Sequence, residues 1–112
     1  MSDCLFCRIV AGEIPSDRVA ETDQVLAFRD INPAAPQHIL LIPKDHVAES
    51  LAELEDINVL AELVKLAQEI ATGPEFEEGW RLVTNVGDNG GQSVFHLHFH
   101  LLAGRRLGWP PG

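Results

Sequence analysis

The stretch Gln92-Ser93-Val94-Phe95-His96-Leu97-His98-Phe99-His100-Leu101-Leu102 places three of the chain's five histidines at every second position. Apolar residues alternate with them, which favours a β-strand, because successive side chains of a strand point to opposite faces. One face would then be apolar, and the three imidazoles would line the other at spacings of roughly 6.5–7 Å. A helix would scatter the rings around its circumference. A solvated strand face on which histidine happens to recur is the plain alternative. The glycine-rich loop just before the stretch instead favours a site for a small anion or a metal.

Length and composition narrow the class of protein. The 112 residues are 46% hydrophobic and 22% charged, which predicts a single globular domain over residues 1–112. The net charge of −9 argues against a nucleic-acid partner, because such a surface needs a basic patch. We also predict no membrane partner, since no apolar run approaches the roughly 20 residues that span a bilayer. The first residues lack the features of a signal peptide. A cytoplasmic location follows, in which the two cysteines are thiols or metal ligands rather than a disulfide.

The first half of the chain predicts a short helix followed by three strands. The helix covers residues 4–10, with Ser2 and Asp3 as candidate N-caps. Strands over 18–21 and 24–30 form a hairpin that turns at Thr22-Asp23. The two prolines in 32–36 interrupt the sheet. An apolar strand follows over 38–42 and ends at Pro43.

The second half of the chain predicts one long amphipathic helix and two more strands. Apolar residues recur at steps of three and four from Leu51 to Ile70, and Ser50 with Glu53 resembles a capping box. The helix is expected to begin near Glu55 and to end before Gly73-Pro74. We assign it a packing role only. A fourth strand over 80–86 then leads through the glycine-rich loop 87–91 into the histidine stretch.

The histidine stretch favours chemistry at phosphorus. Much of an unperturbed imidazole is neutral and nucleophilic near pH 7. His98, the middle ring, has a neighbour on each side that can hold an anionic electrophile, and phosphoryl transfer depends mainly on positioning and charge stabilisation. Gly90 and Gly91 would let backbone N–H groups approach phosphate oxygens. Ser93 offers a hydroxyl that can protonate or orient a leaving group.

Metal binding is the rival use of these residues. A catalytic His-x-His centre usually needs a carboxylate nearby in the sequence, and none lies between Asp88 and the C-terminus. Cys4-x-x-Cys7 is a separate signal that supplies half of a four-coordinate zinc site. His46 and His96 are the imidazoles available to complete it.

The C-terminal segment 104–112 has too much glycine and proline for a helix or strand, yet it carries Trp109. A large apolar side chain near a free terminus usually packs on something, and a partner subunit is one candidate.

The histidine stretch resembles the His-φ-His-φ-His-φ-φ signature, with φ apolar, of the histidine-triad superfamily. The likeness extends over nearly the whole chain, to residues 27–33, 35–38, 42–44, 85–93 and 109–112. Gly90-Gly91-Gln92-Ser93-Val94 resembles the Hint branch of purine nucleoside phosphoramidases, whereas the Fhit branch usually has Thr at position 93. Cys4 and Cys7 depart from the eukaryotic Hint pattern and resemble bacterial members of the superfamily.

The resemblance implies both a fold and a reaction. The fold is α+β, with a five-stranded antiparallel sheet, a short N-terminal helix and one long amphipathic helix. Two such sheets join across a homodimer into one sheet of ten strands. The reaction is hydrolysis of an adenosine or guanosine 5′-phosphoramidate to the mononucleotide and an amine, with no cofactor for catalysis. A dinucleoside polyphosphate hydrolase on the same scaffold is one alternative. A nucleotide-binding or protein-interaction module with incidental hydrolysis is the other.

The resemblance also implies roles for individual residues. The expected catalytic residues are His98 as the nucleophile, His96 and His100 beside the phosphate, His38 in a relay, and Ser93 near the leaving nitrogen. The nucleotide is expected to contact Asp30 and Ile31 at the ribose, Phe28, Leu5, Phe6 and Ile9 at the purine, and Asn85, Gly91, Ser93, His98 and His100 at the phosphate, while Trp109 reaches the partner's site. Cys4, Cys7, His46 and His96 are expected to bind one structural zinc ion per subunit. Purely structural roles remain open for His38, Asp30 and the apolar residues of the purine pocket.

Overall fold

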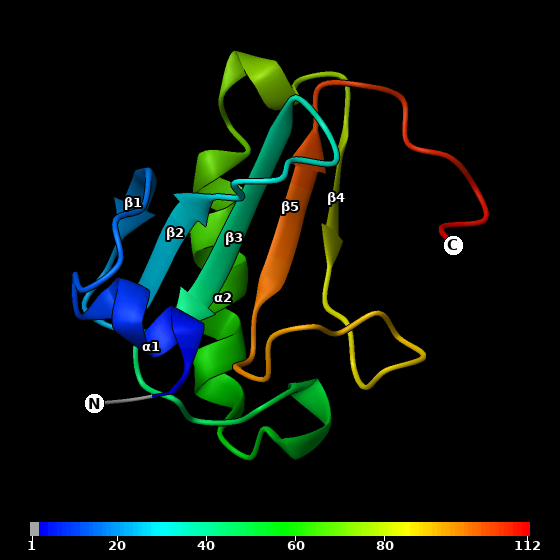
Figure 1. Ribbon diagram of the computed structural model, residues 1–112. Helices are drawn as coiled ribbons and strands as arrows, with labels where there is room; N and C mark the ends of the chain where they lie inside the picture. Colours follow the sequence, from blue (N-terminus) through cyan, green and yellow to red (C-terminus); the bar gives the residue numbers. More distant parts are fainter. Residues whose placement is uncertain (1–2) are drawn as a thin grey trace.

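The computed structural model describes residues 3–112, and its centre is a five-stranded antiparallel sheet in the order β1-β2-β3-β5-β4. The strands are β1 (Arg18–Glu21), β2 (Val25–Arg29), β3 (Gln37–Pro43), β4 (Trp80–Val83) and β5 (Phe99–Ala103). Helix α1 (Leu5–Val10) covers part of one face of the sheet and helix α2 (Ile57–Ile70) covers the other (Figure 1). Two 3₁₀ turns, η1 (Leu51–Glu53) and η2 (Pro74–Phe76), flank α2. The predicted α+β class with this set of elements is confirmed.

Two apolar clusters hold the layers together, one on each face of the sheet. The cluster on the α2 face includes Val25, Ala27, Ile39, Leu41, Leu63, Leu66, Leu97, Phe99 and Leu101. The cluster on the α1 face consists of Phe6, Ile9, Leu26, Phe28, Leu40 and Ile42, with further residues packed against it. Neighbouring residues of β2 and β3 thus belong to opposite clusters. Because both of their faces are covered, these two strands are apolar almost throughout.

The hairpin between β1 and β2 forms at the predicted turn. Thr22 Oγ1 accepts hydrogen bonds from the backbone N–H groups of Gln24 and Val25, at 3.2 and 3.0 Å. The Thr22 N–H closes the turn on the Val25 carbonyl at 2.8 Å. Side-chain bonds of this kind give threonine its preference for turns.

Both helices have N-caps other than the predicted ones. The Cys4 Sγ accepts from the Cys7 N–H and caps α1, whereas Asp3 does not and Ser2 lies outside the described residues. The Ser50 side chain caps only η1, where it accepts from the Ala52 N–H. The chain becomes extended at Leu54, so α2 begins at Ile57 with Asp56 as its N-cap. The start expected near Glu55 is close to the observed one, and the apolar Leu54 packs on the α2-face cluster although it lies outside the helix.

The histidine stretch is only partly a strand, contrary to the prediction. β5 begins at Phe99, so His100 lies in the strand while His96 and His98 precede it. Strand β3 ends at Pro43, and the Leu97 N–H bonds instead to the Ala48 carbonyl at 3.0 Å. Strand β4 likewise ends at Val83, opposite His100, rather than at the predicted residue 86.

The alternation of faces nevertheless continues through the stretch. Leu97, Phe99 and Leu101 belong to the α2-face cluster, as the pattern predicted. The histidine side is buried rather than solvated, since His96 is 0% exposed and His98 is 6% exposed. Within residues 3–112, no helix is long and apolar enough to cross a bilayer.

Candidate functional site

A cavity of about 450 Å³ opens on the face of the sheet that α1 covers only in part. Its volume and largely apolar lining are typical of small-molecule sites. The apolar wall consists of Leu5, Phe6, Ile9, Ile14, Pro15, Phe28, Ile31, Leu40 and Val94, and the polar groups come from Ser16, Arg29, Asp30, Asn32, Ser93, His98 and His100.

Strand pairing explains why the histidines meet at this cavity. β3 and β5 are antiparallel with Leu40 opposite His100, so these two side chains share the α1 face. His38 is two residues from Leu40 in β3 and therefore lies on the same face. The His38 Nε2 lies 2.9 Å from the His100 Nδ1, although 62 residues separate the two in the sequence. Asp30 extends the group, with its Oδ2 3.5 Å from the His38 Nε2.

The ring of His98 is held with one nitrogen free of the backbone. Its Nδ1–H donates to the His96 carbonyl at 2.7 Å, so in the neutral ring Nε2 carries the lone pair. Phe6 packs edge-on against the ring, with centroids 5.0 Å apart at 84°. This arrangement gives the neutral His98 ring a defined tautomer with an available lone pair on Nε2.

The hydrogen bonds of His38 and His100 define a second pair of tautomers. The Ala34 N–H donates to the His38 Nδ1 at 2.9 Å, so the proton of the neutral His38 ring is on Nε2. That Nε2–H donates to the His100 Nδ1, and the proton of His100 is therefore on its own Nε2. His98 and His100, which both line the cavity, thus differ in kind: one has an Nε2 lone pair and the other an Nε2–H donor.

Burial keeps these rings neutral. Desolvation is the largest cause that lowers the pKa of His38 and of His98, and it outweighs the opposing charge of Asp30. The pKa of His100 falls to about 4, because burial and the neighbouring His98 and His38 all disfavour a second positive charge. A neutral His98 at physiological pH is the form that can act as a nucleophile.

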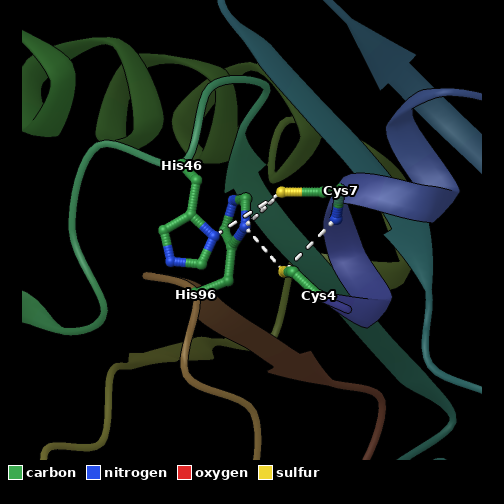
Figure 2. Close-up of side chains that lie close together, drawn as sticks. All are labelled: Cys4, Cys7, His46 and His96. Atoms are coloured by element: carbon green, nitrogen blue, oxygen red, sulfur yellow. Dashed lines mark hydrogen bonds between the residues drawn. The ribbon is translucent and has the colours of Figure 1, made fainter. Parts of the chain in front are cut away.

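A second cluster lies beside the cavity and consists of Cys4, Cys7, His46 and His96 (Figure 2). The two cysteines come from α1 and its N-cap, and the imidazoles come from the loop after β3 and from the histidine stretch. Their ligand atoms all lie within 4.8 Å of one another. The predicted pair of cysteines and pair of histidines is therefore brought together.

The distances within this cluster fit tetrahedral zinc. The His96 Nδ1 is 3.3 Å from the Cys4 Sγ and 3.6 Å from the Cys7 Sγ, and the His46 Nδ1 is 3.5 Å from the Cys7 Sγ. Zinc–ligand bonds of about 2.0–2.3 Å at tetrahedral angles separate S and N by about 3.5 Å. The His96 Nε2–H donates to the Pro43 carbonyl at 2.8 Å, which leaves Nδ1 as the ligand nitrogen. Burial lowers the pKa of His96 and so favours the neutral ring that a metal needs.

The group formed by Asp30, His38 and His100 is also compact, but its hydrogen bonds do not suit a metal. The Ala34 N–H occupies the His38 Nδ1, and the neutral His38 ring therefore carries its proton on Nε2, the atom nearest Asp30 and His100. A metal ligand needs a lone pair at that position. We interpret this group as a hydrogen-bond relay.

Several predicted site residues lie away from the cavity. His96 is fully buried, both of its ring nitrogens are engaged, and it does not line the cavity. Asn85 and Gly91 do not line the cavity. The N–H groups of Gly90 and Gly91 close turns on the Gly87 and Asp88 carbonyls instead of pointing to a ligand. Trp109 is 83% exposed and does not line the cavity of its own chain.

Part of the cavity lining lies outside the residues predicted from the sequence. Leu40 could have been found, because it lies two residues from His38 in β3. Ile14, Pro15, Ser16, Asn32 and Val94 also line the cavity. They sit in loops between elements, where no periodic pattern indicates which way a side chain points.

A five-stranded antiparallel sheet that presents alternate histidines beside a nucleotide-sized cavity defines the class of histidine-triad proteins. The model of the HIT domain matches residues 11–107, and this chain belongs to the HIT domain family.

The relatives extend over nearly the whole chain. A 14 kDa zinc-binding protein of Zea mays is 48% identical and covers 99% of this chain and 89% of its own length. Adenylylsulfatase HINT1 of Arabidopsis thaliana is 47% identical, covering 99% of this chain and 78% of its own. A HIT family hydrolase from Legionella pneumophila superimposes with a TM-score of 0.92 at 48% identity, covering 98% of this chain and all of its own. These likenesses support the Hint branch and a hydrolase that acts on nucleotides.

We predict that His100 stays neutral far into acid. Its ring should titrate near pH 4 rather than near 6.5, as followed by NMR of the imidazole nitrogens with His100→Gln used for assignment. The unfolded chain binds a proton at this residue below about pH 6.5 and the folded chain does not, so stability falls as the pH drops from about 6.5 to 4. A midpoint near 6.5 would contradict the burial of this ring beside His98 and His38.

We predict that protein purified without added zinc contains about one zinc ion per chain, as measured by elemental analysis. Cys7→Ser should lose the metal, because it removes one of four ligands. His38→Gln is the matched control and should keep the metal, because His38 belongs to the relay. A wild-type stoichiometry near zero would rule the site out.

Proposed function

We propose that this protein hydrolyses purine nucleoside 5′-phosphoramidates to the nucleoside monophosphate and an amine, through a nucleotidyl intermediate on His98. The observation that carries the proposal is the hydrogen bond from the His98 Nδ1–H to the His96 carbonyl. It leaves the Nε2 lone pair on a buried, neutral ring that lines the cavity. No metal takes part in the reaction we propose.

The first displacement forms a bond between the His98 Nε2 and phosphorus while the bond from phosphorus to the leaving nitrogen breaks. Positive charge develops on the His98 ring, and the His96 carbonyl stabilises it at the Nδ1–H. The His100 Nε2–H donates to a phosphoryl oxygen. The Ser93 hydroxyl, also in the cavity lining, gives a proton to the departing amine and regains one from solvent.

The second displacement returns the enzyme to its starting state. Water attacks phosphorus on the side that the amine has left and releases a proton to solvent, and the bond to the His98 Nε2 breaks. The nucleoside monophosphate leaves and His98 is again neutral, with its proton on Nδ1. Each displacement is in line, and such reactions depend strongly on how the reacting groups are positioned.

The cavity supports a purine nucleoside as the bound group. Phe6 and Phe28 form an edge-to-face pair with centroids 5.7 Å apart and, with Leu5 and Ile9, provide an apolar slot for the base. Asp30 lies at the polar edge of the slot, where its carboxylate can accept hydrogen bonds from ribose hydroxyls. Ile31 adjoins Asp30 in the lining.

The leaving group is the least determined part of the substrate. The Arabidopsis relative is named for action on an adenylyl sulfate, and dinucleoside polyphosphates are a further class that shares the nucleotidyl group. All three classes transfer the same nucleotidyl group to His98, and they differ in what departs. The presence of Ser93, with a hydroxyl suited to a leaving nitrogen, favours the phosphoramidate.

A homodimer is part of the proposal. Strand β4 lies at the edge of the sheet, where a second copy can extend the sheet to ten strands. Trp80 on that strand is 42% exposed and Trp109 is 83% exposed, which is unusual for side chains of this size. We propose that Trp109 reaches the active site of the partner subunit.

We predict that a fluorogenic adenosine 5′-phosphoramidate is turned over and that His98→Ala abolishes turnover. Mass spectrometry of quenched single-turnover reactions should show a nucleotidyl adduct on the wild-type chain only. Adenosine 5′-phosphosulfate and a diadenosine polyphosphate are the competing substrates and should give lower kcat/KM. Binding of the nucleotide without release of amine or formation of an adduct would refute the catalytic reading and favour a binding module.

We predict a mass of twice the 12.3 kDa chain in sedimentation equilibrium. Phosphoramidate turnover should be reduced in Trp109→Ala and absent in His98→Ala. After the two variants exchange subunits, the turnover of the mixture should exceed the sum of their separate activities. In the mixed dimer, the intact Trp109 of one chain serves the intact His98 of the other. If mixing brings no gain, Trp109 does not act across the dimer.

A further inference from the structure

The loop of residues 30–36 carries an active-site group at its start and leads to another just after its end. Asp30 lines the cavity, and His38 follows the loop in β3. Between them, the Ala34 N–H donates to the His38 Nδ1 at 2.9 Å. The position of this one peptide group therefore decides which nitrogen of His38 carries the proton.

The other backbone group of Ala34 is held by Arg105. The Arg105 Nε and Nη2 both donate to the Ala34 carbonyl, at 3.1 and 2.9 Å, across 71 residues of sequence. The third guanidinium nitrogen, Nη1, donates to the Arg106 carbonyl at 2.9 Å and fixes the fork in place. Such planar, charge-assisted contacts restrain orientation better than one ammonium can.

A second contact holds the same loop against the same turn. Gly104 has φ of +96°, and a Cβ at this position would lie 2.8 Å from the Pro36 Cβ. The turn after β5 thus contacts the loop at two points. Gly104 lies close to Pro36, and Arg105 donates hydrogen bonds to Ala34. Ala34 itself is exposed, while the next residue, Ala35, is buried and also helps to hold the loop.

We propose that Arg105 is a positioning residue of the active site, acting through Ala34 on the tautomer of His38. With the Ala34 N–H in place, His38 donates its Nε2–H to His100, and His100 keeps its own Nε2–H for the phosphoryl group. Without it, His38 can carry the proton on Nδ1, and its Nε2 then accepts from the His100 Nδ1–H. His100 loses its Nε2–H in that state. The expected effect on turnover rests on the proposed function, whereas the expected effect on the His38 tautomer is independent of it.

Nucleotide affinity should depend much less on Arg105. The start of the loop has its own restraints, because the Asp30 N–H donates to the His38 carbonyl at 3.0 Å. The Asn32 N–H donates to the Asp30 Oδ1 at 2.8 Å. Helix α1, which forms one wall of the cavity, makes no hydrogen bond to Arg105 within residues 3–112. We therefore expect a change in kcat with little change in KM.

The test compares Arg105→Ala and Arg105→Lys with Arg106→Ala. The Arg106 variant is matched for charge and position, and the Arg106 side chain makes no hydrogen bond or ion pair within residues 3–112. Ring ¹⁵N shifts of His38 report the tautomer, calorimetry measures the affinity for adenosine 5′-monophosphate, and the phosphoramidate assay gives kcat and KM. We expect Arg105→Ala to shift the His38 ring toward Nδ1–H and to lower kcat roughly tenfold, the order expected when a supporting hydrogen bond is lost.

The kcat and the His38 tautomer of Arg105→Lys should lie between those of the wild type and Arg105→Ala. Arg106→Ala should match the wild type in both. If His38 keeps its Nε2–H in both Arg105 variants, or if Arg106→Ala has the same effect as Arg105→Ala, the proposal is wrong. Circular dichroism confirms folding, and Arg105→Lys decides the question if Arg105→Ala does not fold. If the wild type fails to cleave the phosphoramidate, the proposed function falls, while the ¹⁵N shifts still test the role of Arg105.

Discussion

The antiparallel pairing of β3 with β5 is the constraint on which the site depends. Its register places Leu40 opposite His100, which sends His38 and His100 to one face and Leu101 to the other. The pairing of these two strands therefore places apolar side chains in the core on the α2 face and brings His38 and His100 together on the α1 face. A slip of one residue would exchange the faces, turning imidazoles into the apolar core. Packing and chemistry are therefore specified by the same hydrogen bonds.

Backbone groups, more than charged side chains, determine what each imidazole can do. The carbonyl of His96 holds a proton on the His98 Nδ1, the carbonyl of Pro43 holds one on the His96 Nε2, and the amide of Ala34 excludes one from the His38 Nδ1. Three similar rings thereby acquire three different properties: His98 has a lone pair on Nε2, His96 has one on Nδ1, and His38 has an Nε2–H that donates to His100. Burial reinforces this by lowering the pKa of each ring. Peptide groups suit the task because their orientation is set by the fold and does not vary with pH.

The candidate metal cluster adjoins the nucleotide cavity through α1. This helix has only six residues, too few to be stable by itself, and its cap Cys4 and its own Cys7 belong to the cluster. Between the two cysteines, Phe6 packs against His98 and Phe28 of the cavity and also against His96 of the cluster. A metal held at the cysteines would therefore steady the wall of the cavity as well as the helix, which gives a physical reason for a structural ion at this place.

Local patterns in the sequence sufficed for the elements and for the faces of the strands. Alternation in the histidine stretch and the run of apolar residues in β3 reflect side-chain geometry that holds wherever a strand forms, and Cys4-x-x-Cys7 states its chemistry in four residues. The limits of β4 and β5 and the partners of His38 could not be found in this way. Each depends on where another segment ends or lies, as Pro43, Ala48 and Arg105 show. The sequence by itself determined which residues can do chemistry and which face they share. Only the tertiary structure decided which nitrogen of each ring is available, because that depends on backbone groups brought in from distant parts of the chain.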